Sequence, residues 1–149
     1  MFTLEQVSML TGLTTRALRN YMKDGFLQGD KSSGKWLFTP EQYMAFTNHP
    51  TVTPALQTKK MNIITSFINS HPESCNRVCV ILDVKENLVE TMHFFLSAVK
   101  EIAASDESPE ELFQFSSDKL GDDIVRFIIR GEENLVLELL TKYKTMKQE

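Results

Sequence analysis

Residues 2–43 read FTLEQVSMLTGLTTRALRNYMKDGFLQGDKSSGKWLFTPEQY, and this stretch decides the fold of the N-terminal third of the chain. A first helix is expected after Thr3, because its hydroxyl can accept an N–H of the first turn and Gln6 completes a capping-box pattern. Gly12 ends this helix, since glycine tolerates a left-handed residue after the last turn. The apolar side chains recur three residues apart, a helical spacing: Leu4, Val7 and Leu10.

A second helix, a hairpin and a third helix follow. Thr14 is the expected N-cap of TRALRNYMKDG and Gly25 stops it, so two short helices are joined by a tight, glycine-containing turn. A polar turn over residues 29–34 separates two apolar segments, which is the pattern of a hairpin. Thr39 caps a third helix with Pro40 at its first position. This order predicts a winged helix-turn-helix domain.

This part of the chain resembles the DNA-binding domain of the MerR family of bacterial regulators. The resemblance covers about the first third of the chain and rests on many positions in register rather than on one short motif. It is carried by three segments: FTLEQVSMLTGLTTRALRNYMKDGFL, SGKWLF and TPEQY. In that family the second helix enters the major groove of DNA and the wing holds the phosphate backbone.

Carried over by position, the resemblance implies a set of DNA-contacting residues. The recognition helix would open with Thr14, Thr15 and Arg16, and phosphate contacts would come from Arg19 and Tyr21. The wing would contribute Lys31, Lys35 and Trp36. The chain departs from the family at two places, because Trp36 replaces the usual wing arginine and Asn20 stands where an aromatic residue is common.

Length and composition place the chain among globular proteins. Its 149 residues suit one domain or two small ones, and 42% are hydrophobic. A run of about 18 apolar residues, as a membrane span requires, is absent. The chain opens on a capped helix rather than a signal peptide, and its two cysteines make no secreted disulfide framework. A cytoplasmic location is therefore expected, with no membrane partner.

Charge is unevenly distributed along the chain. The net formal charge is −4, yet the first 50 residues hold five Lys/Arg against four Asp/Glu, giving +1. The remaining 99 residues hold 11 against 16, giving −5. An acidic remainder would repel DNA and keep it at the first domain. The five cations of the first 50 residues all lie on the predicted recognition helix or wing: Arg16, Arg19, Lys23, Lys31 and Lys35.

The domain boundary is predicted at the proline-rich segment 48–54, through which neither helix nor strand can run. Residues 1–49 would form the DNA-binding domain and residues 50–70 a linker and connecting helix, capped by Thr53. Its apolar stripe includes Leu56, Ile63 and Phe67. Two interpretations stay open, because this helix could pair with its copy in a dimer or pack on the domain that follows.

Residues 71–149 predict a small α/β domain, which makes the whole chain α+β. Strands are expected at 77–84, 112–116 and 124–130, and helices at 86–104 and 132–146, with a loop at 105–109 and a polar turn at 118–123. The continuous apolar character of the first strand predicts burial on both of its faces. Together with the connecting helix the order is α-β-α-β-β-α. This is an open-faced sandwich, close to a ferredoxin-like unit that lacks its last strand.

The sequence contains no recognisable catalytic, cofactor or metal motif, and an enzyme is not expected. Four carboxylates could hold a cation but lack the order of a calcium loop: Asp83, Asp118, Asp122 and Asp123. His71, Cys75 and Cys79 are spaced four apart, and thiolates suit soft metals. Cys79 lies in a predicted strand, where it would act as a small core residue, so Cys75 is the one candidate sensing residue.

The sequence predicts a sequence-specific DNA-binding transcriptional regulator that acts as a homodimer on double-stranded DNA. By the family resemblance its C-terminal part would sense a signal, such as an unknown small-molecule effector, or dimerise. The dimer interface would be either helix 54–70 or the C-terminal domain. One alternative is an excisionase-like or architectural DNA binder of a mobile element. Another is a protein-interaction adaptor whose winged helix does not touch DNA, which Trp36 and the modest charge favour.

Overall fold

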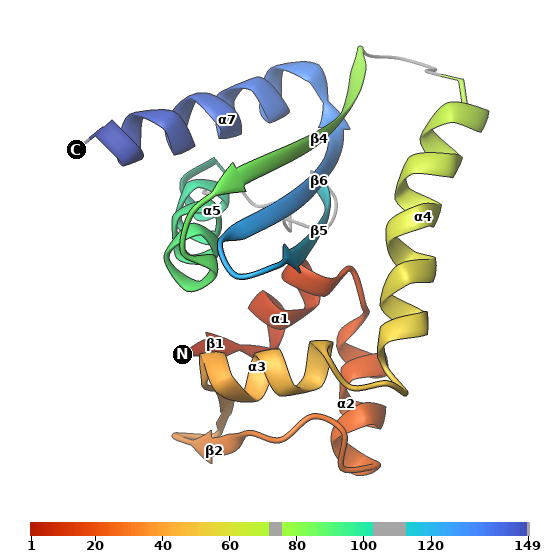
Figure 1. The fold of residues 1–149 in the computed structure, drawn as a ribbon, viewed down its shortest axis with the longest axis vertical. Helices are drawn as coiled ribbons and strands as arrows, with labels where there is room; N and C mark the ends of the chain where they lie inside the picture. The colour runs from red at the N-terminus through yellow and green to blue at the C-terminus, as the bar shows by residue number, and fades with distance from the viewer. Residues whose placement is uncertain (72–75, 103–112, 149) are drawn as a thin grey trace. The chain divides into compact units, whose positions relative to one another are not determined.

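The computed structural model of this chain describes residues 1–71, 76–102 and 113–148 (Figure 1). Within these residues it is an α+β protein with six helices and two three-stranded antiparallel sheets. The chain divides into two compact units, Met1–Asn62 and Ile63–Glu149. The division falls inside helix α4 (Thr53–Asn69), so this one helix contributes residues to both units.

The first unit begins with strand β1 (Phe2–Thr3), helix α1 (Leu4–Thr11) and helix α2 (Thr15–Lys23). Strands β2 (Asp30–Ser32) and β3 (Lys35–Phe38) and helix α3 (Pro40–Thr47) follow, and the strands form a sheet in the order β1-β3-β2. The predicted capping box of α1 and the predicted N-cap of α3 are confirmed, and Gln42 completes a second capping box that was not predicted from the sequence. Thr3 with Gln6 starts α1, and Thr39 with Gln42 starts α3 with Pro40 in its first turn.

The hairpin turn is tighter than the sequence predicted. Of the six residues assigned to it, only Ser33 and Gly34 lie between paired strands, because Ser32 is paired with Lys35. Their φ angles of +53° and +79° match a type I′ turn, whose twist suits a two-residue hairpin. The polar residues 30–32, interpreted as turn, instead form β2 because they are an exposed edge that needs no apolar side chains.

Helix α4 begins at Thr53, but that residue does not act as the predicted N-cap. Its hydroxyl donates to the carbonyl oxygen of His49 at 3.0 Å, and its backbone N–H donates to the same oxygen. Thr53 therefore continues the turn that comes before it instead of accepting from the helix. The reason is that residues 50–52 already form turns directly before the helix, where the sequence predicted a linker.

The second unit contains strand β4 (Arg77–Lys85), helix α5 (Leu88–Ile102), strands β5 (Phe113–Leu120) and β6 (Ile124–Glu132), and helix α7 (Glu133–Gln148). With α4, this is the predicted order α-β-α-β-β-α. The predicted loop 105–109 lies outside the described residues. Strand β5 runs four residues further than predicted, because residues 117–120 pair with β6, and the predicted turn 118–123 is correspondingly shorter.

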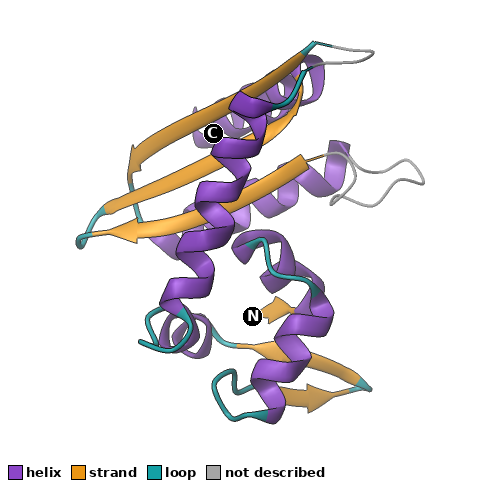
Figure 2. Ribbon diagram, turned by 90° about the vertical axis from the view of Figure 1, so that its right-hand side faces the viewer, coloured by secondary structure: helices purple, strands orange, loops and turns teal. Residues whose placement is uncertain are grey.

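The sheet of the second unit has the order β4-β6-β5, so β6 is central, and α5 and α7 cover one of its faces (Figure 1 and Figure 2). Val125, Phe127 and Ile129 of β6 are buried and share this face, since alternate residues of a strand point the same way. The Phe95 ring of α5 lies 4.3 Å from the Phe127 ring and stacks on Tyr143 of α7 at 4.3 Å. These aromatic rings join the three elements.

Strand β4 is not buried on both faces as predicted. It lies at an edge of the sheet, its side chains are half-buried or exposed, and Ile81 at its centre is 54% exposed. The continuous apolar residues of β4 are typical of a central strand. Which strand is central depends, however, on pairing with distant segments of the chain. That position goes to β6, which has neighbours on both sides.

The second half of α4 contacts the opposite face of this sheet. Arg130 of β6 points away from buried Ile129, and its guanidinium donates to the Ile63 carbonyl at 3.3 Å and to the Ser66 hydroxyl. The Phe67 ring lies 5.1 Å from the Arg77 guanidinium and 5.6 Å from that of Arg130. Ile63 is buried. This part of the predicted apolar stripe therefore packs on its own chain.

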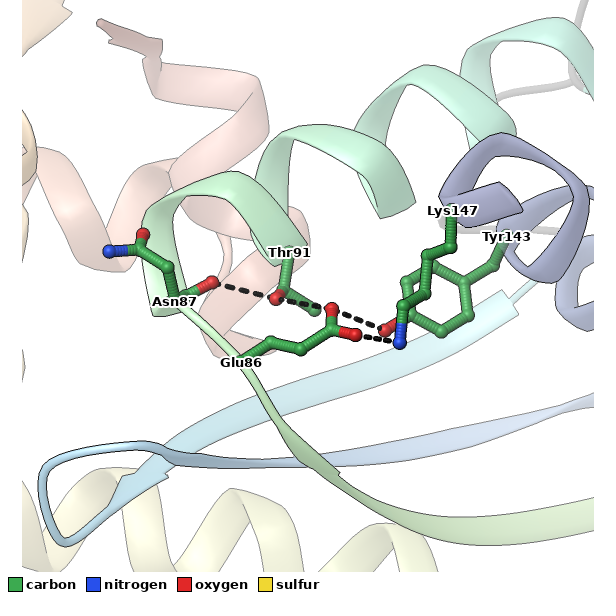
Figure 3. Close-up of polar contacts among 5 residues, drawn as sticks. All are labelled: Glu86, Asn87, Thr91, Tyr143 and Lys147. Carbon is green, nitrogen blue, oxygen red and sulfur yellow. Dashed lines mark hydrogen bonds and ion pairs between the residues drawn. The ribbon is translucent and has the colours of Figure 1, made fainter. Parts of the chain in front are cut away.

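A polar network joins the start of α5 to the end of α7 (Figure 3). The carboxylate of Glu86 accepts a hydrogen bond from the Tyr143 hydroxyl at 3.0 Å and one from Thr91 at 3.4 Å, and it pairs with Lys147. Asn87 caps α5 by accepting the N–H groups of residues 89 and 90. Burial raises the pKa of Tyr143 above its usual value, which keeps the phenol in its neutral, donating form.

We predict that replacing Gly29 or Gly34 by alanine lowers the free energy of unfolding by different amounts. Gly34→Ala meets no atom within 4 Å, so only the positive φ opposes it, at about 1 kcal/mol. Gly29→Ala would bring Cβ within 2.5 Å of the buried Phe38 ring, at about 2–3 kcal/mol. Urea unfolding followed by the fluorescence of Trp36, the single tryptophan, measures both. Equal costs would contradict the packing of Phe38 on Gly29.

We also predict an alkaline destabilisation that depends on Tyr143. An unfolded tyrosine ionises near pH 10, and the folded pKa is higher, so the unfolded state loses its proton first and stability falls as pH rises past about 10. Tyr143→Phe should lose about 1 kcal/mol at neutral pH with its hydrogen bond to Glu86. Its free energy of unfolding should then decline less steeply above about pH 10. Parallel pH profiles for the two proteins would refute the assignment.

Candidate nucleic-acid interface

Helix α2 presents one polar face to solvent. Arg16, Arg19, Asn20 and Lys23 are all exposed, and their spacing of three, four and seven residues places them on one side of the helix. Leu18, on the other side, is completely buried. No ion pair found among the described residues involves the three cations of this face. Asn20 was not predicted as a site residue, although the same helical spacing would have found it.

An aromatic cluster holds the C-terminal half of α2 in place. The Tyr21 ring is half-buried and lies 5.3 Å from the Phe46 ring of α3 and 6.3 Å from the Phe26 ring. Phe26 in turn lies 4.8 Å from the ring of His49. Tyr21, expected at a phosphate, thus packs its half-buried ring against Phe26 and Phe46. Its clearest role is to fix the rotation of α2 about its own axis.

The turn between α1 and α2 is supported by two buried hydroxyl groups that the sequence did not single out. Ser8 donates to the Leu13 carbonyl at 2.6 Å, and Thr11 donates to the Val7 carbonyl at 2.7 Å. The Thr11 oxygen also accepts the N–H of Leu13 at 3.2 Å. Gly12 takes the left-handed conformation between them, with φ +75°. These bonds satisfy backbone groups in the turn and define the geometry between the two helices.

The residues at the start of α2 have different roles: Thr14 caps the helix, and Arg16 is exposed to solvent. The Thr14 hydroxyl accepts the backbone N–H of Ala17 at 3.1 Å, which confirms it as N-cap. Its oxygen is thus engaged in starting the helix. Thr15 is half-buried, whereas the side chain of Arg16 is exposed at the first turn. Of the three residues expected to open a recognition helix, Arg16 is therefore the one with a long, accessible donor group.

The hairpin carries its two lysines on opposite faces. Lys31 is paired across the strands with Trp36, and its Nζ atom lies 5.9 Å from the centre of the indole ring. Lys35 is paired with Ser32, one step nearer the turn, so its side chain points to the other face. The structure thus brings Lys31 and Trp36 together and separates Lys35 from both.

The two units differ in charge. Residues 1–62 hold seven Lys/Arg and four Asp/Glu, a net charge of +3, and residues 63–149 hold nine and sixteen, a net charge of −7. In the second unit several cations are paired with carboxylates, such as Arg126 with Asp83 at 2.7 Å and Lys142 with Glu101 at 3.2 Å. Five of the seven cations of the first unit lie on α2 and the hairpin.

The candidate metal-binding and sensing residues of the second unit do not form a site among the described residues. The hydrogen bonds from Arg126 lower the pKa of Asp83, and burial raises the pKa of the Cys79 thiol, which disfavours the reactive thiolate. Cys75 lies outside the described residues. Among the residues that the structure does describe, no three His, Cys, Asp or Glu side chains come close enough to hold a metal ion.

Comparisons of this chain with protein-family models, with curated proteins and with solved structures found no match. In the described ranges, no helix is long and apolar enough to cross a membrane.

Proposed function

We propose that this protein is a sequence-specific DNA-binding transcriptional regulator and that its first unit is a winged helix-turn-helix domain. The observation that carries the proposal is the exposed face of α2, where three cations and an amide lie opposite a buried leucine. An α-helix fits the major groove of B-DNA, and arginine and asparagine are the side chains best suited to reading base edges there. The MerR-like character of residues 2–43 supports the same function.

The hairpin suits the role of a wing that enters a groove. Its two lysines lie on opposite faces of a narrow, two-residue turn, so a tip inserted into the minor groove would place one cation toward each phosphate backbone. A hairpin lying flat on one strand would use only one of them. The neutral turn residues Ser33 and Gly34 leave the tip thin.

The second unit would provide the regulatory part of the molecule. Its element order and strand order β4-β6-β5 correspond to a ferredoxin-like unit without the last strand, as the sequence suggested. Its net charge of −7 would repel DNA and so confine binding to the first unit. A homodimer would place two copies of α2 on the two halves of an operator.

A protein-interaction adaptor is the second candidate, and the environment of Trp36 favours it. This half-buried indole stands at the wing beside Lys31, and tryptophan is enriched at the centres of protein interfaces. Binding to genomic DNA fragments over a series of salt concentrations separates the two functions. A regulator binds some fragments preferentially and loses affinity steeply with salt, whereas an adaptor shows neither behaviour.

We predict that Arg16→Ala costs about 1–3 kcal/mol on the preferred DNA fragment and less on random DNA, because the side chain reads a base edge. Fluorescence anisotropy with labelled duplexes measures both affinities. Lys59→Ala is the matched control, since Lys59 is an exposed cation of the same unit outside α2 and the hairpin. Equal losses on both duplexes would assign Arg16 to the phosphate backbone instead.

We predict that the double variant Lys31→Gln and Lys35→Gln flattens the salt dependence of binding by roughly two units of slope, with sequence preference retained. Each single variant should account for about one unit, because the two side chains would meet different phosphates. Lys59→Gln with Lys119→Gln removes the same charge elsewhere and controls for net charge. A slope unchanged in the wing variant would mean that the hairpin does not contact DNA.

A further inference from the structure

The outer edge of β4 is a long, unprotected strand edge. In the described residues β4 pairs only with β6, over nine consecutive residue pairs without a bulge. Its sequence RVCVILDVK contains no proline or glycine, and the five residues 78–82 carry no charge. Natural sheet edges are normally blunted by a bulge, a proline or a central charge, because unpaired backbone groups invite another strand. This edge has none of these devices.

The other edge of the same sheet provides an internal comparison. Strand β5 has the sequence FQFSSDKL, with Asp118 and Lys119 in its second half. Polar and charged residues of this kind discourage strand addition. On β4 the exposed position is instead apolar, because Ile81 is 54% exposed at the middle of the strand. Both edges carry charged residues in their second halves, Asp83 and Lys85 on β4 and Asp118 and Lys119 on β5. What distinguishes β4 is therefore the exposed apolar residue at its middle.

We propose that two copies of this chain pair through β4, antiparallel and centred on Val80, to form one continuous six-stranded sheet. In antiparallel pairing about a twofold axis, the residue numbers of any two opposite residues add up to the same total. That total must be even, so that one residue lies opposite its own copy at the centre. Among such registers, the one centred on Val80 places Arg77 of each copy opposite Asp83 of the other. Centring on Ile81 would instead oppose Arg77 and Lys85, two cations.

The Val80 register also keeps the layers of the two copies in line. Val80 lies on the face of the sheet covered by α5 and α7, since it is paired with buried Ile129. Residues opposite each other in an antiparallel pair share a face, so the helices of both copies would cover the same side of the joined sheet. Ile81 of one copy would lie opposite Cys79 of the other, on the second face.

This inference stands apart from DNA binding, because it rests on the second unit alone and its test uses no DNA. The first measurement is sedimentation equilibrium of the full chain, with a dimer expected. The second is disulfide trapping of Val80→Cys in a background of Cys75→Ala and Cys79→Ala. Opposite residues in an antiparallel pair have Cα atoms about 4.5–5.5 Å apart, within disulfide reach, so a covalent dimer should form on oxidation.

Val84→Cys in the same background is the matched control. It lies on the same strand and the same face, but the two copies of residue 84 would be eight strand positions apart, about 27 Å, and should not cross-link. A monomeric full chain, or cross-linking at residue 84 as efficient as at residue 80, would overturn the proposal.

Ile81→Lys provides an independent readout that does not depend on cross-linking. Because Ile81 is largely exposed, a lysine there should leave the circular dichroism spectrum unchanged. It would place a charge at the middle of the proposed junction, so the dissociation constant of the dimer should rise by at least about tenfold. A dimer of unchanged affinity would show that the chains associate through another surface.

Discussion

The burial of Leu18 is the constraint on which the proposed function depends. A nine-residue helix with one completely buried side chain can rotate little about its axis, and the ring contacts of Tyr21 with Phe26 and Phe46 remove the remaining freedom. The opposite side of α2 must then face solvent. Because that side carries Arg16, Arg19 and Lys23, packing in the core determines where three of the seven cations of the first unit lie.

The cations of the two units also differ in whether they are paired with carboxylates. In the second unit several cations are engaged with carboxylates, as in the two hydrogen bonds from Arg126 to Asp83. Arg130 is likewise occupied, because its guanidinium binds α4 and lies over Phe67. Among the described residues, no ion pair involves Arg16, Arg19 or Lys23, so a polyanion would find three unpaired cations on one side of α2. Exposed charge pairs contribute little to stability, so this distribution matters more for partner choice than for folding.

Helix α4 illustrates how one amphipathic segment can serve two units. Its apolar stripe was open to two interpretations, a dimer contact or packing within the chain. Ile63 is buried, Phe67 lies between two guanidinium groups, and the carbonyl of Ile63 accepts a hydrogen bond from the sheet. Ile63 and Phe67 are thus engaged by the chain itself, whereas Met61 and Ile68 of the same helix are 54% and 72% exposed. The unpaired edge of β4 is the other surface of the described residues that could join two copies.

The N-caps of α1, α2 and α3, the capping glycine of α1 and the order of elements in the second unit could all be predicted from the amino-acid sequence. Those features depend on residues a few positions apart, such as Thr3 with Gln6 or Thr14 with Ala17, whose hydrogen bonds form within one turn. That β6 rather than β4 is the central strand could not be predicted in this way, because burial depends on pairing between segments far apart in the chain. The same holds for Lys31 and Lys35, whose opposite faces follow from a strand register that sequence spacing alone did not reveal.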